Sequence, residues 1–470
     1  MYDNVPSSYP KDFFYNLSKL SGSMSKQLIK VTADNVNAQP STITNVRLPI
    51  GSLINLDSLL LYFTVDIKGS NVTFPARYSS SFVKRMSLTM NNVSVQIIQD
   101  YNLVYNTFAD LNNKNYTKGL AGEYLDNSTL FDDSTAGSSE VSITAKNMNA
   151  ALTNQTGIKM CINNWLGLFG SASTKIINTD LTGEVIVSIE WANNYECLGG
   201  TPESSATTYT SSDTYDVKDI YMTMEALSFS DSSYYSSIMN KDLMIGFYDY
   251  IVTKFAPVQK ASGINVTTYI NAGSLDSIYG TAVLPQSVPS EMVCYGSNGD
   301  GASANVINIF KYLSDPVSYV NNNGTGGKSG DGFWNTKALQ RQLQHMKSSQ
   351  FSINNKQLNY GEFNPQENFN QLLLTMGYLN VDSGPSGFHS GMVSLKHFYK
   401  YYAVCAQSLE LIDRDAFYIS GLSSQGSSCS INWRCNFNGD SANTMSITPV
   451  LISKLSKVLH VKPGRMVFVE

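Results

Sequence analysis

The chain has 470 residues, of which 42% are hydrophobic. This length is more than one compact core usually holds, so about two to three domains are expected. The formal net charge is −5 and the Lys and Arg residues are scattered, so specific binding of nucleic acid through neutralised phosphates is not expected. No window approaches the ~20 consecutive apolar residues that cross a bilayer, and the first residues lack the basic and apolar regions of a signal peptide.

Residues 1–38 are predicted to form an N-terminal arm, and alternating strands are expected after it. DSLLLYFTVDI (57–67) is one early strand. MSLTMNNVSVQII (86–98) alternates apolar and polar residues on both sides of Asn91-Asn92, and asparagine tolerates the positive φ of a two-residue hairpin turn. Apolar residues then recur every three or four positions, which predicts a short amphipathic helix over roughly 99–111.

Two later strands complete the first half of the chain. GEVIVSIEW (183–191) places alternate apolar residues on one face and ends in Trp191, and VKDIYMTMEALSF (217–229) follows it. Such alternation is typical of strands with one face in a core. The first domain is therefore predicted to span 39–237.

The second half repeats these events in the same order. SSQFSINNKQL (348–358) carries another Asn-Asn turn, and a helix follows in which Asn364 is the cap, Pro365 the first helical residue and Glu367 the partner in a capping box. GSSCSINW (426–433) ends in a tryptophan as its counterpart does. The shared order predicts a duplicated β-domain, with the second copy spanning 238–470.

A long exposed loop is expected at about 285–340, and it contains NNNGTGGKSGDG (321–332). Its Gly-Lys-Ser resembles the end of a phosphate-binding loop. However, Asn322 stands where that motif requires glycine, and the glycines after Ser329 disfavour the helix that should begin there. The segment is therefore interpreted as a surface loop and not as a nucleotide site.

Other chemical motifs fail at a required position. His389 and His397 lie eight residues apart and match no metal-binding motif. SNGDGAS (297–303) resembles a calcium loop, but Gly296 and Ile307 stand where carboxylates are required.

The sequence also contains no convincing motif for a catalytic nucleophile, an acid–base pair of carboxylates or an aromatic platform that binds sugars. The sequence contains no G-x-S-x-G elbow, and the pair Asp132-Asp133 lies in a polar loop. Trp191 and Trp433 end alternating apolar faces, so they are interpreted as core or interface residues and not as a sugar platform. The sequence therefore predicts no catalytic, cofactor-binding or metal-binding residue.

The six cysteines are spread without a C-x-x-C pair, which argues against a zinc site. Cys429 and Cys435 lie an even number of residues apart on one predicted strand, so both point to the same face. Buried free thiols are expected, and the Asn-x-Ser/Thr triplets are interpreted as chance products of the composition.

Several of these segments together resemble the double-jelly-roll major capsid proteins of double-stranded DNA viruses, most closely those of polinton-like viruses and virophages. The resemblance covers roughly 26–470 and is carried by RLPIGSLINLDSLLLYFTVDI, LTMNNVSVQIIQDYNLVYNTFADL, GEVIVSIEWANN, FSINNKQLNYGEF, GSSCSINWRCNF and LHVKPGRMVFVE. It implies an all-β fold with two tandem eight-stranded jelly-roll β-sandwiches and short helices in the connecting loops.

The resemblance also implies a function in construction. The chain would be a virion protein, assembled inside the host cell, whose homotrimers form pseudo-hexagonal capsomers of an icosahedral capsid. Its partners would be neighbouring capsomers, penton proteins and minor capsid proteins, with no enzyme activity, no cofactor and no specific nucleic acid. The N-terminal arm, with Phe13, Phe14 and Tyr15, would contact neighbouring capsomers or an internal membrane.

A second interpretation stays open from the sequence. A secreted or virion-surface β-sandwich adhesin, or receptor-binding module, would also be rich in Ser, Thr, Asn and Tyr. It predicts an export signal, disulfides and exposed aromatic clusters, whereas a capsomer predicts a stable trimer.

Overall fold

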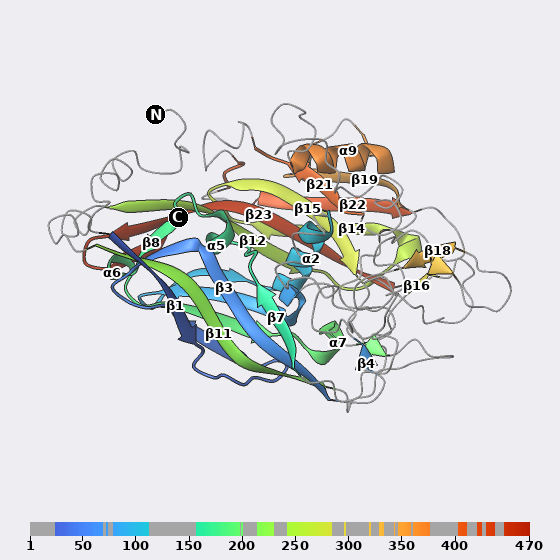
Figure 1. Ribbon diagram of the computed structural model, residues 1–470. Helices are drawn as coiled ribbons and strands as arrows, with labels where there is room; N and C mark the ends of the chain where they lie inside the picture. The colour runs from blue at the N-terminus through green and yellow to red at the C-terminus, as the bar shows by residue number, and fades with distance from the viewer. Residues whose placement is uncertain are drawn as a thin grey trace, which may run out of the picture.

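The structure is a computed structural model in which two antiparallel β-sandwiches lie side by side (Figure 1). The first sandwich is built mainly from the first half of the chain and the second from the second half. The described residues are 24–68, 72–73, 79–111, 157–197, 199–200, 214–229, 242–283, 296–297, 319–320, 329–332, 343, 346–358, 361–376, 403–410, 421–424, 429–437 and 446–470.

The first sandwich consists of two layers, which we call sheet 1A and sheet 1B. Sheet 1A has the order β1 (Met24–Thr32), β11 (Thr214–Phe229), β3 (Leu53–Lys68) and β7 (Ile158–Ile162), and β8 (Ile176–Asn178) also pairs with β3. Sheet 1B has the order β2 (Ile43–Arg47), β9 (Val185–Trp191), β5 (Val83–Met90) and β6 (Val93–Ile98).

The second sandwich repeats this arrangement in sheets 2A and 2B. Sheet 2A has the order β12 (Leu243–Lys254), β23 (Ser446–Lys462), β15 (Leu275–Val283) and β21 (Cys405–Ser408), and β13 (Val258–Gln259) and β24 (Met466–Val469) also pair with β23. Sheet 2B has the order β14 (Ile264–Ile270), β22 (Cys429–Phe437), β19 (Met346–Ile353) and β20 (Lys356–Gln357).

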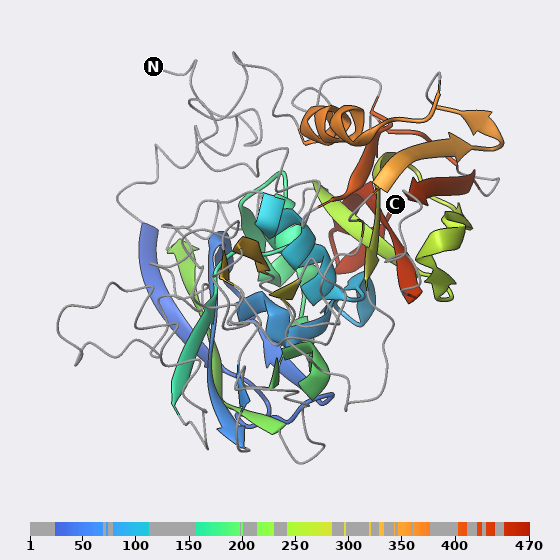
Figure 2. The same cartoon turned by 90° about the vertical axis from the view of Figure 1, so that its right-hand side faces the viewer.

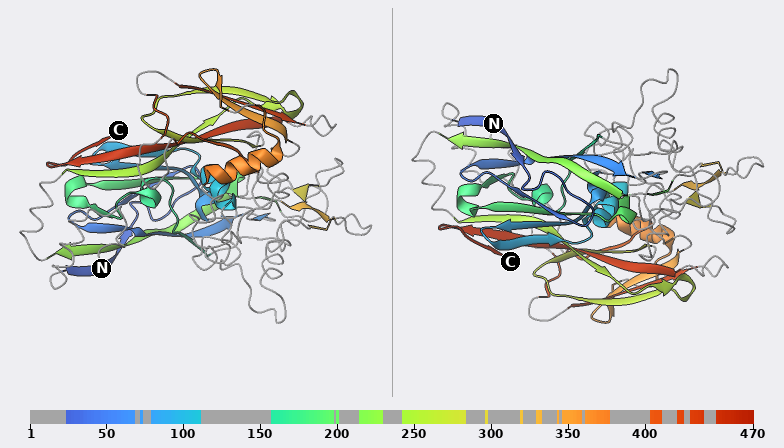
Figure 3. Two further views of the ribbon diagram at one scale, coloured as in Figure 1. Left: turned by 90° about the horizontal axis from the view of Figure 1, so that it is seen from above. Right: turned by 90° about the horizontal axis from the view of Figure 1, so that it is seen from below.

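The eight principal strands of each sandwich follow the same chain order and occupy the same places in the two sheets. A helix follows the fifth strand in each copy: α2 (Tyr101–Leu111) after β6, and α9 (Pro365–Thr375) after β20. Figure 3 shows that the strands of both sandwiches run in roughly the same direction. The prediction of two tandem eight-stranded sandwiches with short helices between strands is therefore confirmed.

Local sequence signals explain the matching hairpins and helices. Asn91 and Asn92 have φ of 46° and 63°, and Asn354 and Asn355 have φ of 50° and 61°, which are the left-handed conformations that a tight hairpin turn requires. At α9, the Asn364 side chain accepts from Glu367 N at 2.9 Å, and the Glu367 side chain accepts from Asn364 N at 2.8 Å. Both predicted turns and the predicted capping box are confirmed.

Shorter elements occupy the connections. In the first half they are η1 (Ser79–Phe82), α5 (Leu168–Ser171), α6 (Thr179–Thr182), α7 (Asn194–Cys197) and a small ladder of β4 (Val72–Thr73) with β10 (Gly199–Gly200). The second half contributes η3 (Lys260–Ser262) and a small sheet of β16 (Gly296–Ser297), β18 (Ser329–Gly332) and β17 (Tyr319–Val320).

Each sandwich is centred on a fully buried tryptophan. The Trp191 ring packs edge-on against Phe63, with ring centroids 5.0 Å apart, and its Nε1 donates to Thr44 Oγ1 at 2.8 Å. The Trp433 ring lies against Gly280, where an added Cβ would come within 2.6 Å of the indole. The interpretation of both tryptophans as core residues agrees with their complete burial.

The first strand differs from the sequence prediction. The arm predicted over residues 1–38 is wrong for 24–38, because Met24–Thr32 pairs with β11 along its whole length and Ala38 forms a bridge to Val217. As an edge strand, β1 buries only part of one face, so its sequence MSKQLIKVT lacks a clear apolar alternation. Residues 1–23 and the domain boundary predicted at 237/238 lie outside the described residues.

Candidate functional site: the interface between the two sandwiches

The interface between the sandwiches begins at the edge of β12. Ser171 and Ser173 of the first sandwich bond to the backbone of β12. Ser173 N donates to Gly246 O at 2.8 Å, and Ser173 Oγ accepts from Gly246 N at 2.9 Å. Ser171 Oγ accepts from Tyr248 N at 2.8 Å. An edge strand otherwise presents a row of unpaired backbone groups that invites pairing with another chain. Ser171 of α5 and the nearby Ser173 therefore cap this edge within one molecule.

Gln96 of β6 joins three segments at the same place. Its Nε2 donates to Asp249 Oδ1 at 2.7 Å and to Tyr248 O at 3.0 Å, and its Oε1 accepts from Leu168 N at 2.9 Å. The side chain is only 2% exposed, and a buried amide needs such partners because leaving it unpaired costs free energy. The carboxylate of Asp249 also accepts from Lys457 Nζ at 2.6 Å.

The approach to Gln96 depends on a glycine. Gly167 has φ of +75°, and a Cβ at that position would lie 2.2 Å from Gln96 Oε1. Only glycine combines this left-handed conformation with the missing side chain at no steric cost. The chain therefore brings the backbone of α5 directly onto the amide that contacts the second sandwich.

A charged cluster lies at the start of α2. Asp100 Oδ1 accepts from Lys84 Nζ at 2.7 Å and from Lys254 Nζ of the second sandwich at 2.6 Å, and Lys84 also pairs with the buried Glu196. Burial alone would lower the pKa of Lys84, but Glu196 and Asp100 outweigh it and raise that pKa. Burial would raise the pKa of Asp100, but the two ammonium groups outweigh it and lower that pKa.

The apolar part of the interface is the contact of α2 with sheet 2A. The ring of Phe108 lies 5.7 Å from Tyr250 and 4.9 Å from Tyr279, the second contact being edge-on. Such aromatic contacts contribute beyond their buried area. All nine residues of β15 are buried, because sheet 2B covers one face of sheet 2A and the first sandwich covers the other.

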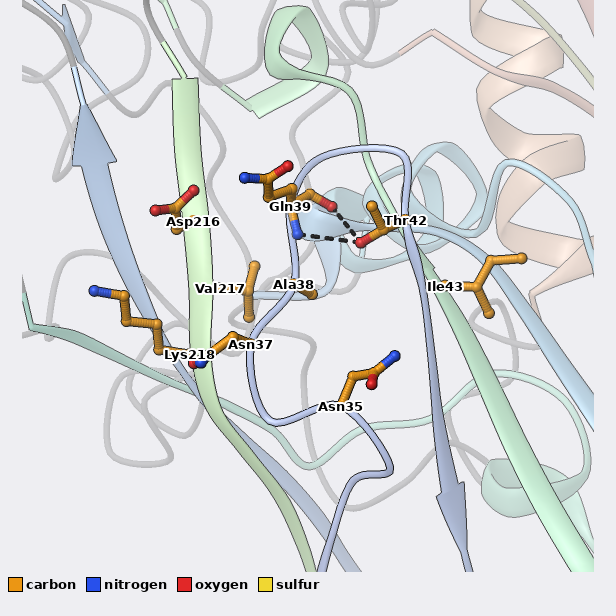
Figure 4. A pocket seen from close by; sticks show the side chains of 9 residues that line it. All are labelled: Asn35, Asn37, Ala38, Gln39, Thr42, Ile43, Asp216, Val217 and Lys218. Carbon is orange, nitrogen blue, oxygen red and sulfur yellow. Dashed lines mark hydrogen bonds between the residues drawn. The ribbon is translucent and has the colours of Figure 1, made fainter.

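A pocket of about 470 Å³ lies between β11 and the loop that joins β1 to β2 (Figure 4). Its charged residues are already paired: Lys218 Nζ lies 2.6 Å from Asp66 Oδ2, and Asp216 pairs with Lys68. The bond to Asp66 raises the pKa of Lys218. The hydroxyl of Thr42 is bonded to the backbone of Gln39, so the polar lining serves the loop and presents no nucleophile beside a base.

The structure separates the residues that the sequence singled out. His389, His397, Ile307 and the pair Asp132-Asp133 lie outside the described residues. Gly296 begins the small strand β16, and Ser329 begins the strand β18, where a phosphate-binding loop would open a helix.

Other tryptophan, histidine and cysteine side chains serve the core or the chain end. Trp165 Nε1 donates to Leu59 O at 2.8 Å, and His460 stacks on Phe468 with ring centroids 4.6 Å apart. Cys161, Cys197, Cys405, Cys429 and Cys435 are free and buried, and Cys294 lies outside the described residues. Within the described part of the chain, no group of three or more His, Cys, Asp or Glu could hold a metal ion.

Sequence reasoning did not find the interface residues. Gln96, Asp249 and Lys254 occur as single polar residues within strands, and nothing in their local pattern distinguishes them from solvent-facing positions. Their partners in the other sandwich lie 152 to 154 residues away along the chain. None of the helices that the structure describes has the length and apolar character needed to cross a bilayer.

The two sandwiches and their shared order define the double-jelly-roll fold, which solved viral capsid structures share. A quasi-atomic structure of the PBCV-1 virus capsid matches with a TM-score of 0.56 and 9% sequence identity, covering 95% of this chain and 96% of that one. The Sputnik virophage structure by cryo-EM matches with a TM-score of 0.53 and 12% identity over 94% and 88% of the two chains.

A third similar structure is the Faustovirus major capsid protein, with a TM-score of 0.51 and 10% identity over 94% of this chain and 91% of that one. At these identities the likeness establishes the fold alone. No protein-family model matches the sequence, and no curated protein matches it.

Proposed function

We propose that this chain is a major capsid protein and that three copies form a pseudo-hexagonal capsomer of an icosahedral virion. The observation that carries the proposal is the packing of two sandwiches of one topology, in which the first covers a sheet of the second through Gln96, Phe108 and the α5 residues. Repeating that contact between chains generates a ring of six similar domains. Closed rotational symmetry then limits the ring to three copies.

The composition fits this role. Only 15% of the residues are charged, against about 25% in an ordinary soluble protein, so copies repel one another weakly when they pack. In this proposal the chain resides in the virion, and its partners are neighbouring capsomers, penton proteins and minor capsid proteins. A contact of the N-terminal arm with neighbouring capsomers or an internal membrane stays a prediction.

Light scattering on the purified chain tests the proposal. The expected result is a stable species of three times the 51.6 kDa chain mass, with subunit interfaces on the order of 2,000–5,000 Å² as in obligate assemblies. Electron microscopy of that species should show hexagonal outlines. A monomer at all concentrations that binds glycans would overturn the capsomer and favour the adhesin.

A further inference from the structure

The two sheets of the second sandwich come close together at Trp433 of β22. Figure 2 shows sheet 2A, with the red β23, between α2 of the first sandwich and the orange β19 of sheet 2B. Gly280 of β15 has no side chain, and the Trp433 indole lies against it, so that an added Cβ would be 2.6 Å from the ring. A glycine within a strand often marks such a close approach.

A cysteine from each sheet lies next to this contact. Cys405 of β21 pairs with Gly280 in sheet 2A. Cys435 of β22 lies two residues after Trp433, so both side chains point to the same face of sheet 2B, because successive residues of a strand alternate between faces. Both cysteines are completely buried. The registers therefore bring two thiols from opposite sheets into one part of the core.

The Cys405 thiol points across the sandwich toward sheet 2B. Its Sγ donates to Sδ of Met346 at 3.4 Å, and Met346 of β19 pairs with Phe437 of β22. Phe437 lies two residues after Cys435, on the same strand. A hydrogen bond also joins the Cys405 and Cys435 thiols directly. Three sulfur atoms from three strands are therefore gathered between the two sheets.

The surroundings of Cys435 disfavour its thiolate. Burial and the neighbouring Cys405 raise the pKa of the Cys435 thiol well above its ordinary value, and the ammonium group of Lys260 only partly opposes them. Lys260 is itself 4% exposed. Because the thiolate is the form that reacts with other disulfides, Cys435 exchanges slowly and remains a thiol in a reducing compartment.

We propose that Cys405 and Cys435 form a disulfide that joins sheet 2A to sheet 2B when the protein is in oxidising surroundings. The oxidant is a small disulfide such as oxidised glutathione. One cysteine attacks it as the thiolate, and the other cysteine then displaces glutathione from the mixed disulfide. Two S–H bonds of the protein break and one S–S bond forms, while the oxidant takes up two electrons and two protons and leaves as two thiols.

The bond links the two sheets beside the contact of Trp433 with Gly280. A disulfide stabilises a fold mainly by restricting the unfolded chain, so the oxidised form of the second sandwich resists unfolding more than the reduced form. In the proposed virion, the two thiols stay reduced during assembly inside the host cell and are oxidised outside it. The bond lies within one sandwich, so its formation does not depend on the trimer.

Prolonged incubation of the purified chain with oxidised glutathione tests the proposal. The remaining thiols are then alkylated, and the peptides are mapped by mass spectrometry without reduction. The expected product is a single chain, lighter by two hydrogen atoms, in which one linked peptide pair contains Cys405 and Cys435. The thermal unfolding midpoint of the oxidised chain should lie ~5–10 °C above that of the reduced chain, and dithiothreitol should reverse the rise.

Single alanine variants show which thiols carry the effect. Cys405→Ala and Cys435→Ala should each abolish the rise in the unfolding midpoint on oxidation. Each variant is compared with its own reduced form, so a loss of core packing cancels. Cys429→Ala is the matched control, because Cys429 is a free, buried thiol on the same face of β22, and it should keep the full rise.

The peptide map of the wild-type chain decides the matter even if a variant does not fold. The proposal is overturned if Cys405 and Cys435 are both alkylated after the incubation, or if the linked peptides contain other cysteines. A rise in the midpoint that persists in Cys435→Ala also overturns it. None of these results bears on the proposed capsomer, because the bond lies within one sandwich.

Discussion

Sheet 1A and sheet 2A have the same strand order and the same register at their edge strands, yet β3 alternates buried and half-exposed residues whereas every residue of β15 is buried. Their surroundings make the difference. Sheet 2A lies between sheet 2B and the first sandwich, whereas β3 of sheet 1A keeps half-exposed residues on its outer face. Twin folds in one chain thus acquire different surfaces, and that of sheet 2A is used inside the molecule.

The two tryptophans show the same divergence inside the cores. Trp191 donates to Thr44, whereas Trp433 Nε1 has no hydrogen-bond partner within the described residues. The second indole instead lies flat against Gly280, where a side chain would not fit. The first core is held by a polar contact and the second by close packing.

The largest expected effect lies at the interface. Lys84→Met should destabilise the fold by about 3–5 kcal/mol, because Glu196 is left as a buried charge without its cation. Urea unfolding followed by tryptophan fluorescence measures the change. Arg47→Met is the control, since Arg47 pairs with Asp34 and Glu184 at the surface and its removal should change little. Equal losses in both variants would contradict the assigned role of the interface cluster.

Close packing in the second sandwich gives the next effect. Gly280→Ala should cost about 1–3 kcal/mol, because the new Cβ would lie 2.6 Å from the Trp433 ring and the sheets must move apart. Gly464→Ala is a useful comparison, since no atom lies within 4 Å of its added Cβ and only its φ of +82° opposes the change. The urea concentration at the unfolding midpoint should fall more for Gly280→Ala than for Gly464→Ala. An unchanged midpoint for Gly280→Ala would refute the close packing of Gly280 against Trp433.

The polar contact in the first sandwich can be removed without changing its shape. Thr44→Val should destabilise by about 1–2 kcal/mol, because it leaves the buried Trp191 N–H unpaired. The equivalent residue in the second sandwich is Thr268. Thr268 pairs with Ile431, two residues before Trp433, and Thr44 pairs with Ile189, two residues before Trp191. Thr268→Val should cost less, since Trp433 Nε1 does not use it. The comparison fails if the two valine variants lose the same stability.

The smallest effect is a difference in pH dependence between two carboxylates. Lys84 and Lys254 lower the pKa of Asp100 against the opposing effect of burial, so its contribution is present above pH ~4 and is lost as the pH falls. Burial raises the pKa of Asp276, so its protonated form favours folding and stability declines as the pH rises through that pKa.

The asparagine variants separate the two slopes. Asp100→Asn should reduce the loss of unfolding free energy that occurs as the pH falls below ~4. Asp276→Asn should reduce the loss of unfolding free energy that occurs as the pH rises. Urea titrations between pH ~3 and ~6 measure both. If the two variants alter the pH profile in the same direction, the assigned electrostatic environments are wrong.

The sequence predicted the features that depend on neighbouring residues. The Asn-Asn turns, the capping box at Asn364 and the alternation that buries Trp191 and Trp433 are properties of short segments, and the repeat of these signals predicted two sandwiches. Edge strand β1 was missed because its few inward residues give no clear period. The interface residues Gln96 and Asp249 carried no signal at all.

Local stereochemistry and hydrophobic period therefore determined the strands, the turns and the duplication. The tertiary structure decided which face of each sheet is covered. The alternation of residues along a strand shows that one face is apolar, but it does not show what packs against that face. The capping of β12 by Ser171, Ser173 and Gln96 joins segments more than 70 residues apart. Only the folded chain brings them together, whereas no described strand pairs with the corresponding edge of β1.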